Sequence, residues 1–332
     1  MTGVLRLAIP SDGPLHETSL LFLRSCGLDV LRSNTRRYAA DVPSLPGVTV
    51  HFQRGADIPE KVEERSADLG IVGHDHFLEA RREGGETDVV LDKLGFGQSQ
   101  LVFGVPDSWI DVVSLADVAD LTVEFRDTGK DLRIATKFPR LVERFLLTSG
   151  ITHFSLVHTS GTLEAAPAMG YADVVADIST TGTTLRENRL KTIHGGVVLS
   201  SEACLIGNRV ETGSAAEKLS LATSFVERIE AHLRSLGYYT VTANMRGESA
   251  EGVGDYVLEH SSISGLTGPT ISKVHTNDGQ GWYAITVMVE RVKLLRAVDQ
   301  LRALGADSVT VSQPSYVFQS RSEAASRLTG EA

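Results

Sequence analysis

The stretch that decides the fold reads ADVVADISTTGTTL and runs from Ala172 to Leu185. Its first half has a strand pattern, its middle is a run of small hydroxyl residues with one glycine, and its end begins a helix. Asp173 and Asp177 are four residues apart, so on a strand their side chains share one face. A strand, a small-residue turn and a helix in this order are typical of an α/β fold.

The turn of this stretch, residues 179–184, predicts a phosphate site. Small side chains let backbone N–H groups close around an anion, and a helix N-terminus adds a favourable partial charge. Two carboxylates before the turn, Asp173 and Asp177, suit the 2′- and 3′-hydroxyls of a ribose whose 5′-phosphate lies in the loop. The alternative is a plain turn whose hydroxyls cap the helix. The loop residues are Ser179, Thr180, Thr181, Gly182, Thr183 and Thr184.

Two further segments end strand-like runs with chemically useful residues. SGTLEAAP, residues 160–167, places Glu164 in the first turn of a helix, where the alternative role is to favour the helix dipole. RGADIP, residues 54–59, begins with Arg54, which could pair with a diphosphate through two hydrogen bonds. The alternative for Arg54 is an ordinary surface arginine.

Strand-like and helical patterns alternate over the first 210 residues. A polar segment at residues 208–216 then predicts a linker, followed by a long amphipathic helix over residues 217–236. Beyond it the pattern β-α-β-β-α-β predicts a ferredoxin-like unit. The charged stretch 120–131 is expected to be an exposed loop or hairpin.

Composition excludes several classes of protein. Acidic residues outnumber basic ones 42 to 32, and the formal net charge of −10 repels nucleic acid. The apolar runs are too short for a membrane span, and the N-terminus shows no signal-peptide pattern. Two lone cysteines, Cys26 and Cys204, favour a reducing cytoplasm. The run His74-Asp75-His76 suggests a metal site. Neighbouring positions on a strand point to opposite faces, however, so the three side chains cannot all bind one ion, and no further ligand is evident.

Seven motifs in one order resemble the ATP phosphoribosyltransferase family, which opens histidine biosynthesis. They cover nearly the whole chain and end with a C-terminal part that resembles the regulatory domain of the family's long form. The motifs are LRLAIPSDGPL (5–15), RGADIP (54–59), ADLGIVGHD (67–75), LGFGQSQL (94–101), RIATKFP (133–139), SGTLEAAPAMGYADVVADISTTGTTLRENRL (160–190) and SEACLI (201–206), and the C-terminal part contains GLTGPTIS (265–272) and LRALGADSVTV (301–311).

The resemblance implies a catalytic part with two lobes, like a periplasmic binding protein, and a small regulatory domain. We expect a first lobe from residues 1–106 and 186–210, and a second lobe with the phosphate loop from residues 107–185. The linker and helix would occupy 211–236, the regulatory domain 237–319, and a disordered tail 320–332.

The resemblance also implies an activity. A phosphoribosyl group would pass from phosphoribosyl diphosphate to N1 of the adenine of ATP, with Mg²⁺ required and diphosphate released. The displacement would be in line, with inversion at the anomeric carbon and no covalent nucleophile. The family's long form implies a homo-oligomer that shifts between dimer and hexamer, and inhibition by L-histidine bound at the regulatory domains.

Individual residues match the family's functional positions. Residues 179–184 match the 5′-phosphate loop, and Asp173 and Asp177 match its ribose-binding acids. Glu164 matches an acid near substrate in the preceding loop. The remaining matches are Arg54 and Asp75 lining the cleft, Gln98, Ser99, Gln100 and Lys137 flanking the nucleotide, and Leu266, Thr270 and Ser308 near bound histidine.

One loop departs from the family pattern. Where the family usually carries a basic residue beside its first glycine, this chain reads Ser11-Asp12-Gly13-Pro14. An acid near two polyanions weakens phosphate attraction, which leaves open a catalytically weak or silent regulatory paralogue. A solute-binding protein of the same two-lobed architecture is a further alternative, which the missing signal peptide and the hydroxyl-rich loop disfavour.

Overall fold

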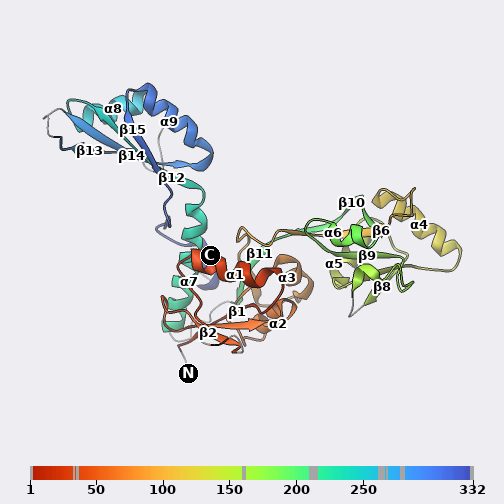
Figure 1. Cartoon of the computed structure of the whole chain (residues 1–332). Helices are drawn as coiled ribbons and strands as arrows, with labels where there is room; N and C mark the ends of the chain where they lie inside the picture. The colour runs from red at the N-terminus through yellow and green to blue at the C-terminus, as the bar shows by residue number, and fades with distance from the viewer. Residues whose placement is uncertain are drawn as a thin grey trace. The chain divides into compact units, whose positions relative to one another are not determined.

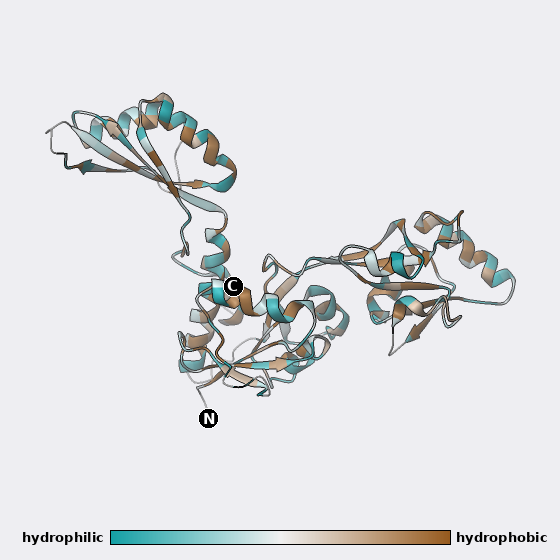
Figure 2. Ribbon diagram, in the orientation of Figure 1, coloured by the Kyte–Doolittle hydropathy of each residue, from teal (hydrophilic) through white to brown (hydrophobic). Residues whose placement is uncertain are grey.

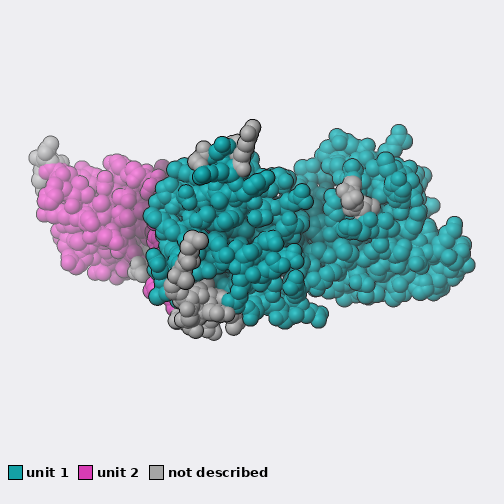
Figure 3. Space-filling view, turned by 90° about the horizontal axis from the view of Figure 1, so that it is seen from below, with its two compact units in different colours: residues 1–223, 324–332 teal, residues 224–323 magenta. Residues whose placement is uncertain are grey.

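The computed structural model describes residues 3–32, 34, 37–158, 162–208, 216–260, 266, 268–276 and 281–329. The chain divides into two compact units, residues 1–223 with 324–332 and residues 224–323, shown in teal and magenta in Figure 3. Each unit has its own hydrophobic core. Among the described residues, no helix is long and apolar enough to cross a membrane.

The first lobe of the first unit is built on a six-stranded sheet in the order β2-β3-β1-β4-β11-β5 (Figure 1). Strands β3, β1 and β4 run parallel, and β11 returns antiparallel to β4 and β5. Strand β4 is buried along its whole length, as its continuous apolar sequence predicts. The strands are β1 (Leu5–Pro10), β2 (Ala39–Asp41), β3 (Val48–Gln53), β4 (Leu69–Gly73), β5 (Thr87–Leu91) and β11 (Ala203–Asn208).

Helices follow the carboxyl ends of the parallel strands. Proline at the first position suits the start of α1, because its missing N–H needs no partner there. On α2, Ile58 and Val62 lie one turn apart and join Ala8 and Val72 in one core cluster. The helices of this lobe are α1 (Pro14–Ser25), η1 (Gly55–Asp57), α2 (Ile58–Glu63) and α3 (His74–Ala80).

The second lobe is built on a five-stranded sheet in the order β10-β6-β9-β7-β8. Strands β7, β8 and β9 run parallel, and β6 runs antiparallel to both β9 and β10. Phe103, Ile134, Val174 and Leu146 are fully buried in its core. Its elements are β6 (Ser99–Pro106), α4 (Leu115–Asp127), β7 (Leu132–Thr136), α5 (Pro139–Thr148), β8 (Phe154–His158), η2 (Leu163–Ala165), β9 (Val174–Ser179), α6 (Thr183–Glu187) and β10 (Leu190–Ser201).

The lobe boundary predicted at residues 106 and 186 needs correction. Strand β6 pairs with β9 and with β10, so residues 99–201 belong to the second lobe. The β6–β10 ladder extends from the pair Leu190 and Pro106 to the pair Ser201 and Ser99. This long-range pairing joins segments about 90 residues apart, which local sequence patterns do not reveal.

The charged stretch 120–131 is helical over most of its length, not the expected loop or hairpin. It belongs to α4, which begins with a capping box between Ser114 and Asp117. Val118 and Thr122 face the core, and the charged residues occupy the remaining surface. Figure 2 shows both hydrophilic and hydrophobic colours on this helix, as an amphipathic helix requires.

The second unit confirms the predicted β-α-β-β-α-β order. Its sheet runs β13-β14-β12-β15, and all its neighbouring pairs are antiparallel. Val241, Val257, Ile285 and Leu301 are fully or almost fully buried between the sheet and its helices. The elements are α7 (Ala216–Ser235), β12 (Tyr238–Arg246), α8 (Ala250–His260), β13 (Thr270–Val274), β14 (Trp282–Glu290), η3 (Arg291–Lys293), α9 (Leu294–Ala303) and β15 (Asp307–Ser312), with the first turns of α7 assigned to the first unit.

The predicted disordered tail contains a helix, α10 (Glu323–Thr329). Ala324 and Leu328 are both 2% exposed, and Leu328 packs against Gly207 of β11. Arg327 Nη1 donates a hydrogen bond to the carbonyl of Val90 at 3.3 Å. Two apolar residues four apart give the segment one buried face, so it folds back onto the first lobe. The last residues, 330–332, and the predicted linker at 209–215 lie outside the described part of the chain.

Candidate functional site

Asp173 lies just before β9 and forms an ion pair with Arg133 of β7. Its carboxylate accepts hydrogen bonds from the Arg133 backbone N–H at 2.8 Å, from Nε at 3.1 Å and from Nη2 at 2.9 Å. Asp177 is four residues further along the strand, which corresponds to roughly 13 Å. Neighbouring ribose hydroxyls are far closer than that. The structure therefore corrects the predicted pair: Asp173 ties β9 to β7, and only Asp177 lies beside the phosphate loop.

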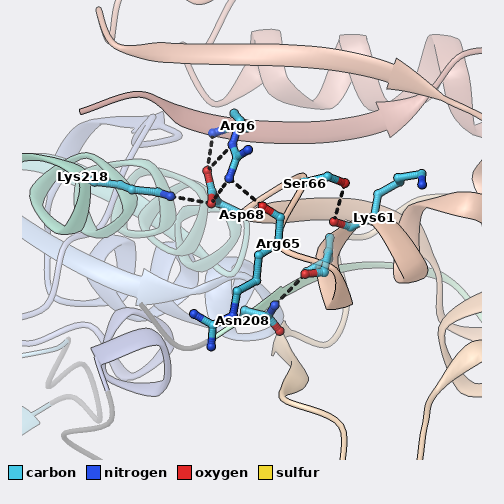
Figure 4. A network of polar contacts seen from close by, with 8 residues as sticks. Arg6, Lys61, Arg65, Ser66, Asp68, Asn208 and Lys218 are labelled. Carbon is cyan, nitrogen blue, oxygen red and sulfur yellow. Dashed lines mark hydrogen bonds and ion pairs between the residues drawn. The ribbon is translucent and has the colours of Figure 1, made fainter. Parts of the chain in front are cut away.

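The first lobe contains the same arrangement (Figure 4). Asp68, just before β4, accepts hydrogen bonds from the backbone N–H, Nε and Nη2 of Arg6 at 2.8, 3.2 and 3.0 Å. Lys218 Nζ adds a contact to Asp68 at 2.6 Å. Burial alone would raise the pKa of Asp68, but the hydrogen bonds from Arg6 and Lys218 outweigh it and hold the pKa below its usual value. Asp68 and Asp173 are thus equivalent structural acids of the two lobes.

Asp177 has the opposite electrostatic setting. Burial is the main cause that raises its pKa, and the negative charge of Glu164 adds to the rise. A hydrogen bond from the Ile178 N–H and the nearby charges of Lys137 and His76 only partly offset the shift. A half-buried carboxyl that forms no ion pair with another described residue is costly for folding and is typical of a functional site.

The predicted phosphate loop has the geometry of a tight turn. Gly182 adopts φ 71°, a left-handed conformation that favours glycine, and its N–H donates to Ser179 Oγ at 3.0 Å. Arg186 Nη2 donates to the Thr181 carbonyl at 3.3 Å, which places a cation directly at the loop. Helix α6 has only five residues, so the expected helix dipole is weak and Arg186 is the stronger source of positive charge. Arg186 lies inside the motif at residues 160–190 but was not among the predicted site residues.

In the second lobe, two more candidate residues follow the carboxyl ends of parallel strands. Lys137 follows β7 directly, and Glu164 lies in η2 after β8. Ligands bind at the carboxyl ends of strands in open α/β sheets, which agrees with these positions. Residues 159–161 of the SGTLEAAP motif lie outside the described residues.

In the first lobe, Arg54 follows β3 and Asp12 follows β1. Both are exposed, and the loop containing Asp12 is tied to the neighbouring strand by the Ser11 N–H and the Gln53 carbonyl at 2.7 Å. Asp75, by contrast, is buried at the start of α3, and its backbone N–H donates to Ser201 Oγ at 3.0 Å. Its side chain is therefore held next to β10 of the second lobe.

A cavity of about 410 Å³ opens where β6 and β10 leave the second sheet. Gln98, Ser99 and Gln100 line it together with Ser179 and Thr180 of the phosphate loop. Three of the four predicted nucleotide-flanking residues thus share one cavity with the start of the predicted phosphate loop, whereas the fourth, Lys137, is not among the lining residues. The other lining residues are His74, Asp92, Lys93, Ser200, Ser201 and Glu202.

The donor chemistry at this site fits Mg²⁺. Asp177 and Glu164 bring two carboxylates close enough for one charge to raise the pKa of the other, and the loop adds hydroxyl oxygens. Mg²⁺ is usually held by one or two carboxylates together with substrate phosphates and water. Among the described residues, no group of three or more His, Cys, Asp or Glu side chains forms a complete cage.

The three predicted regulatory residues do not converge within one chain. Thr270 lies on β13 and Ser308 on β15, at opposite edges of the four-stranded sheet, and Leu266 is 50% exposed. Three strand spacings, roughly 14 Å, separate those edges. A single histidine cannot contact Thr270 and Ser308 of the same chain at once.

Comparisons with known proteins agree on one family. The family described as HisG: ATP phosphoribosyltransferase matches residues 54–235, and the HisG C-terminal domain matches residues 236–313. ATP phosphoribosyltransferase 1, chloroplastic, of Arabidopsis thaliana is 40% identical over 95% of this chain and 77% of its own length. ATP phosphoribosyltransferase of Bradyrhizobium sp. is 30% identical over 99% of this chain and 98% of its own.

A solved structure shares the architecture of the two lobes. The chain from the ATP phosphoribosyl transferase (HisG:HisZ) complex of Thermotoga maritima has 25% sequence identity and a TM-score of 0.51. The match covers 68% of this chain and 96% of that chain.

Proposed function

We infer the function of this chain from its family: it belongs to the ATP phosphoribosyltransferases, in the long form with a HisG C-terminal domain. It transfers a phosphoribosyl group from phosphoribosyl diphosphate to N1 of ATP, and it releases diphosphate. This is the first step of L-histidine biosynthesis. Within the chain, the observation that carries the proposal is the half-buried Asp177, whose pKa is raised, beside the glycine-containing loop at residues 179–184.

Each site residue would have a separate role in an in-line displacement. The loop at residues 179–184 would hold the 5′-phosphate through backbone N–H groups and hydroxyls, with Arg186 as its counter-charge. Asp177 would bind the ribose hydroxyls and, with Glu164, would stabilise positive charge on the ring as the anomeric bond breaks. Lys137 and Arg54 would attract the diphosphate. Catalysis then rests on positioning and charge stabilisation, so no covalent nucleophile is needed.

Mg²⁺ would be held by Asp177 and Glu164 together with oxygens of the substrate diphosphate. When bound, the ion supplies charge neutralisation for the leaving diphosphate. The exposed Arg54 and the loop-bound Arg186 would share that role from the protein side, which compensates for the acid at Asp12.

The C-terminal domain is proposed to bind L-histidine as a feedback inhibitor. Leu266, Thr270 and Ser308 remain the candidate residues. Because Thr270 and Ser308 lie on opposite sheet edges, contact with both would require two chains, which supports a homo-oligomer such as the dimer and hexamer of the long form. We propose the cytoplasm as its compartment, since Cys26 and Cys204 are buried free thiols.

The alternatives are less favoured. A silent regulatory paralogue is disfavoured because relatives aligned over nearly the whole chain are named as the transferase. Asp177 also argues against it, because a chain freed from catalysis has no reason to keep a carboxylate whose partly buried setting raises its pKa. A solute-binding protein would not need the C-terminal regulatory domain.

The test is an assay of the purified full-length protein with ATP, phosphoribosyl diphosphate, Mg²⁺ and a pyrophosphatase. Formation of phosphoribosyl-ATP is followed by its ultraviolet absorbance, with and without millimolar histidine. We expect a rise in absorbance that histidine suppresses. A rise that ignores histidine would remove the feedback proposal, and a folded protein without any rise would point to the silent paralogue.

A further inference from the structure

The motif His74-Asp75-His76 contains an ordered hydrogen-bonded pair, Asp75 and His76. Asp75 Oδ1 accepts hydrogen bonds from the His76 backbone N–H at 2.7 Å and from the ring Nδ1 at 3.0 Å. Gly73 leaves room for this carboxylate, because a Cβ there would lie 2.4 Å from Oδ1. A carboxylate only accepts hydrogen bonds, so Nδ1 carries the proton and Nε2 presents its lone pair.

The His76 ring lies where the two lobes meet. It packs edge-on against Phe138, the residue after Lys137, with ring centroids 5.1 Å apart. Its charge also acts on Asp177 of β9. The Asp75 side chain is 5% exposed and that of His76 is 35% exposed, so the acid is buried and the base remains accessible. Within the described residues, Nε2 has no hydrogen-bond partner.

The charged groups around His76 come from both lobes. Asp75 lies on its own helix and contacts the ring directly. Asp177 of β9 is near enough for the charge of a protonated His76 to lower the pKa of Asp177, and Lys137 precedes Phe138, whose ring packs against that of His76. The Asp75 carboxylate accepts the Nδ1 hydrogen bond, so it fixes the orientation of the ring and leaves Nε2 as an accessible acceptor.

The transfer reaction produces a proton that needs an acceptor. The N1 lone pair of adenine forms the new bond to the anomeric carbon, and the bond to diphosphate breaks with its electron pair leaving on oxygen. The adenine then carries a positive charge, which it loses when its exocyclic amino group gives up a proton. None of the roles assigned above to Asp177, Glu164, Lys137 or Arg54 receives that proton.

Building on the proposed function, we propose that His76, oriented by Asp75, is a catalytic residue that accepts the proton from the exocyclic amino group of adenine. The proton moves from the amino nitrogen to Nε2, and Asp75 stabilises the resulting imidazolium. In the reverse reaction, the same imidazolium returns the proton to the imino nitrogen as diphosphate attacks. General base catalysis of this kind contributes about 10²–10⁴-fold to a rate.

The decisive variant is His76→Gln in the full-length protein. We expect kcat to fall on the order of 10²-fold with little change in either KM or melting temperature. In the wild type, the forward kcat should fall toward acid pH, because a protonated ring cannot accept another proton. The reverse kcat, measured with phosphoribosyl-ATP and diphosphate, should fall as the pH rises. Both pH dependences, of the forward and of the reverse kcat, should be absent from His76→Gln.

Two further variants sharpen the result. His153→Gln is the matched control, because His153 precedes β8, at the end of the sheet opposite the phosphate loop, and it should retain wild-type kcat. His76→Ala opens space for free imidazole, which should restore part of the lost kcat in a concentration-dependent manner.

Three results would overturn the proposal. These are a His76→Gln kcat within threefold of the wild type, pH dependences that persist in that variant, and a slow His76→Ala that imidazole does not rescue. If the wild type itself shows no turnover, the proposed function fails together with this inference. Turnover in the wild type with an unaffected His76→Gln defeats this inference alone.

Discussion

The two lobes of the catalytic part share one frame of strands and ion pairs but carry different chemistry at its far end. In the first lobe Arg6 of β1 binds Asp68 before β4, and in the second Arg133 of β7 binds Asp173 before β9. The strand registers also correspond, because Leu7 pairs with Leu69 and Ile134 pairs with Val174. The frame repeats the sequence pairs Leu-Arg and Ala-Asp in both lobes.

The difference appears at the opposite ends of the same strands. Strand β4 ends at Gly73 and continues into the Asp75–His76 pair, whereas β9 carries Asp177 and continues into the phosphate loop. Acids at the amino ends of the strands are paired with arginine, and their role is structural. Asp177, near a carboxyl end, has no arginine partner in the described part of the chain, and its pKa is raised. Position along the strand therefore separates acids that hold the fold from an acid that serves the reaction.

The largest expected effect comes from comparing two variants, Asp177→Asn and Asp173→Asn. The first change removes the charge that stabilises the reacting ribose, so we expect kcat to fall about 10²–10³-fold. The second should leave kcat within a few-fold and should instead lower stability by about 1–2 kcal/mol through the lost Arg133 pair. Steady-state kinetics and denaturant unfolding of both variants measure the two effects. Equal losses of kcat would remove the distinction between the two ends of the strand.

Asp68→Asn tests the structural acid of the first lobe. Because two cations bind this side chain, we expect a loss of about 2–3 kcal/mol, larger than for Asp173→Asn. The folded-state pKa of Asp68 is lowered, so its stabilisation is present above the usual carboxyl value near 4 and disappears as the pH falls toward the folded-state value. Unfolding measured between pH 3 and 7 should show a flatter acid limb in the variant. A limb identical to that of the wild type would contradict the assignment.

Asp177→Asn should also change stability, with the opposite sign. The pKa of Asp177 is raised in the folded state, so its carboxylate destabilises the fold above that pKa and stops doing so as the pH falls through it. Replacing it should therefore stabilise the ligand-free protein at neutral pH by on the order of 1 kcal/mol while activity is lost. Thermal melts at pH 7 and near pH 4 check this, and the gain should shrink at the lower pH.

The smallest expected effect concerns the loop after β1. Asp12→Lys places a basic residue in the loop where the family usually has one. Asp12 and the loop around it are exposed to solvent. We expect the KM for phosphoribosyl diphosphate to fall about twofold to fivefold, and less at high salt, because exposed charges are screened. Asp29→Lys, an exposed acid paired only with Arg24, is the charge-matched control. A KM unchanged by Asp12→Lys would show that Arg54 and Arg186 already supply the needed charge.

Much of the fold could be predicted from local patterns. The predicted alternation of strands and helices over the first 210 residues is confirmed, because alternating or continuous apolar runs such as β3 and β6 identify strands directly. The ferredoxin-like order of the second unit is confirmed in the same way. The turn at residues 179–184 lies between a strand and a helix as predicted, and its binding of phosphate stays a prediction.

The failures share a physical cause, which is that partners far apart in sequence decide them. The spacing of Asp173 and Asp177 gave the correct face but not the distance along it, and the Arg133 partner lies 40 residues away. The lobe boundary depended on the β6–β10 ladder, and α10 depended on an apolar surface offered by β11. Asp75 and His76 are adjacent in the sequence, but the placement of the two residues depends on the contact of Asp75 with Ser201 and of His76 with Phe138.

Helix α10 changes the connectivity of the regulatory unit. The chain leaves the first unit through α7, whose Lys218 is bound to Asp68, and it returns to the first unit through α10. The second unit is therefore an insertion with two attachments and not a tail with one. A loop closed at both ends has fewer conformations than a free end, and a single proteolytic cut inside it releases neither half. The insertion is fastened to the catalytic part at two places, the Asp68 anchor of α7 and the β5–β11 edge that α10 contacts.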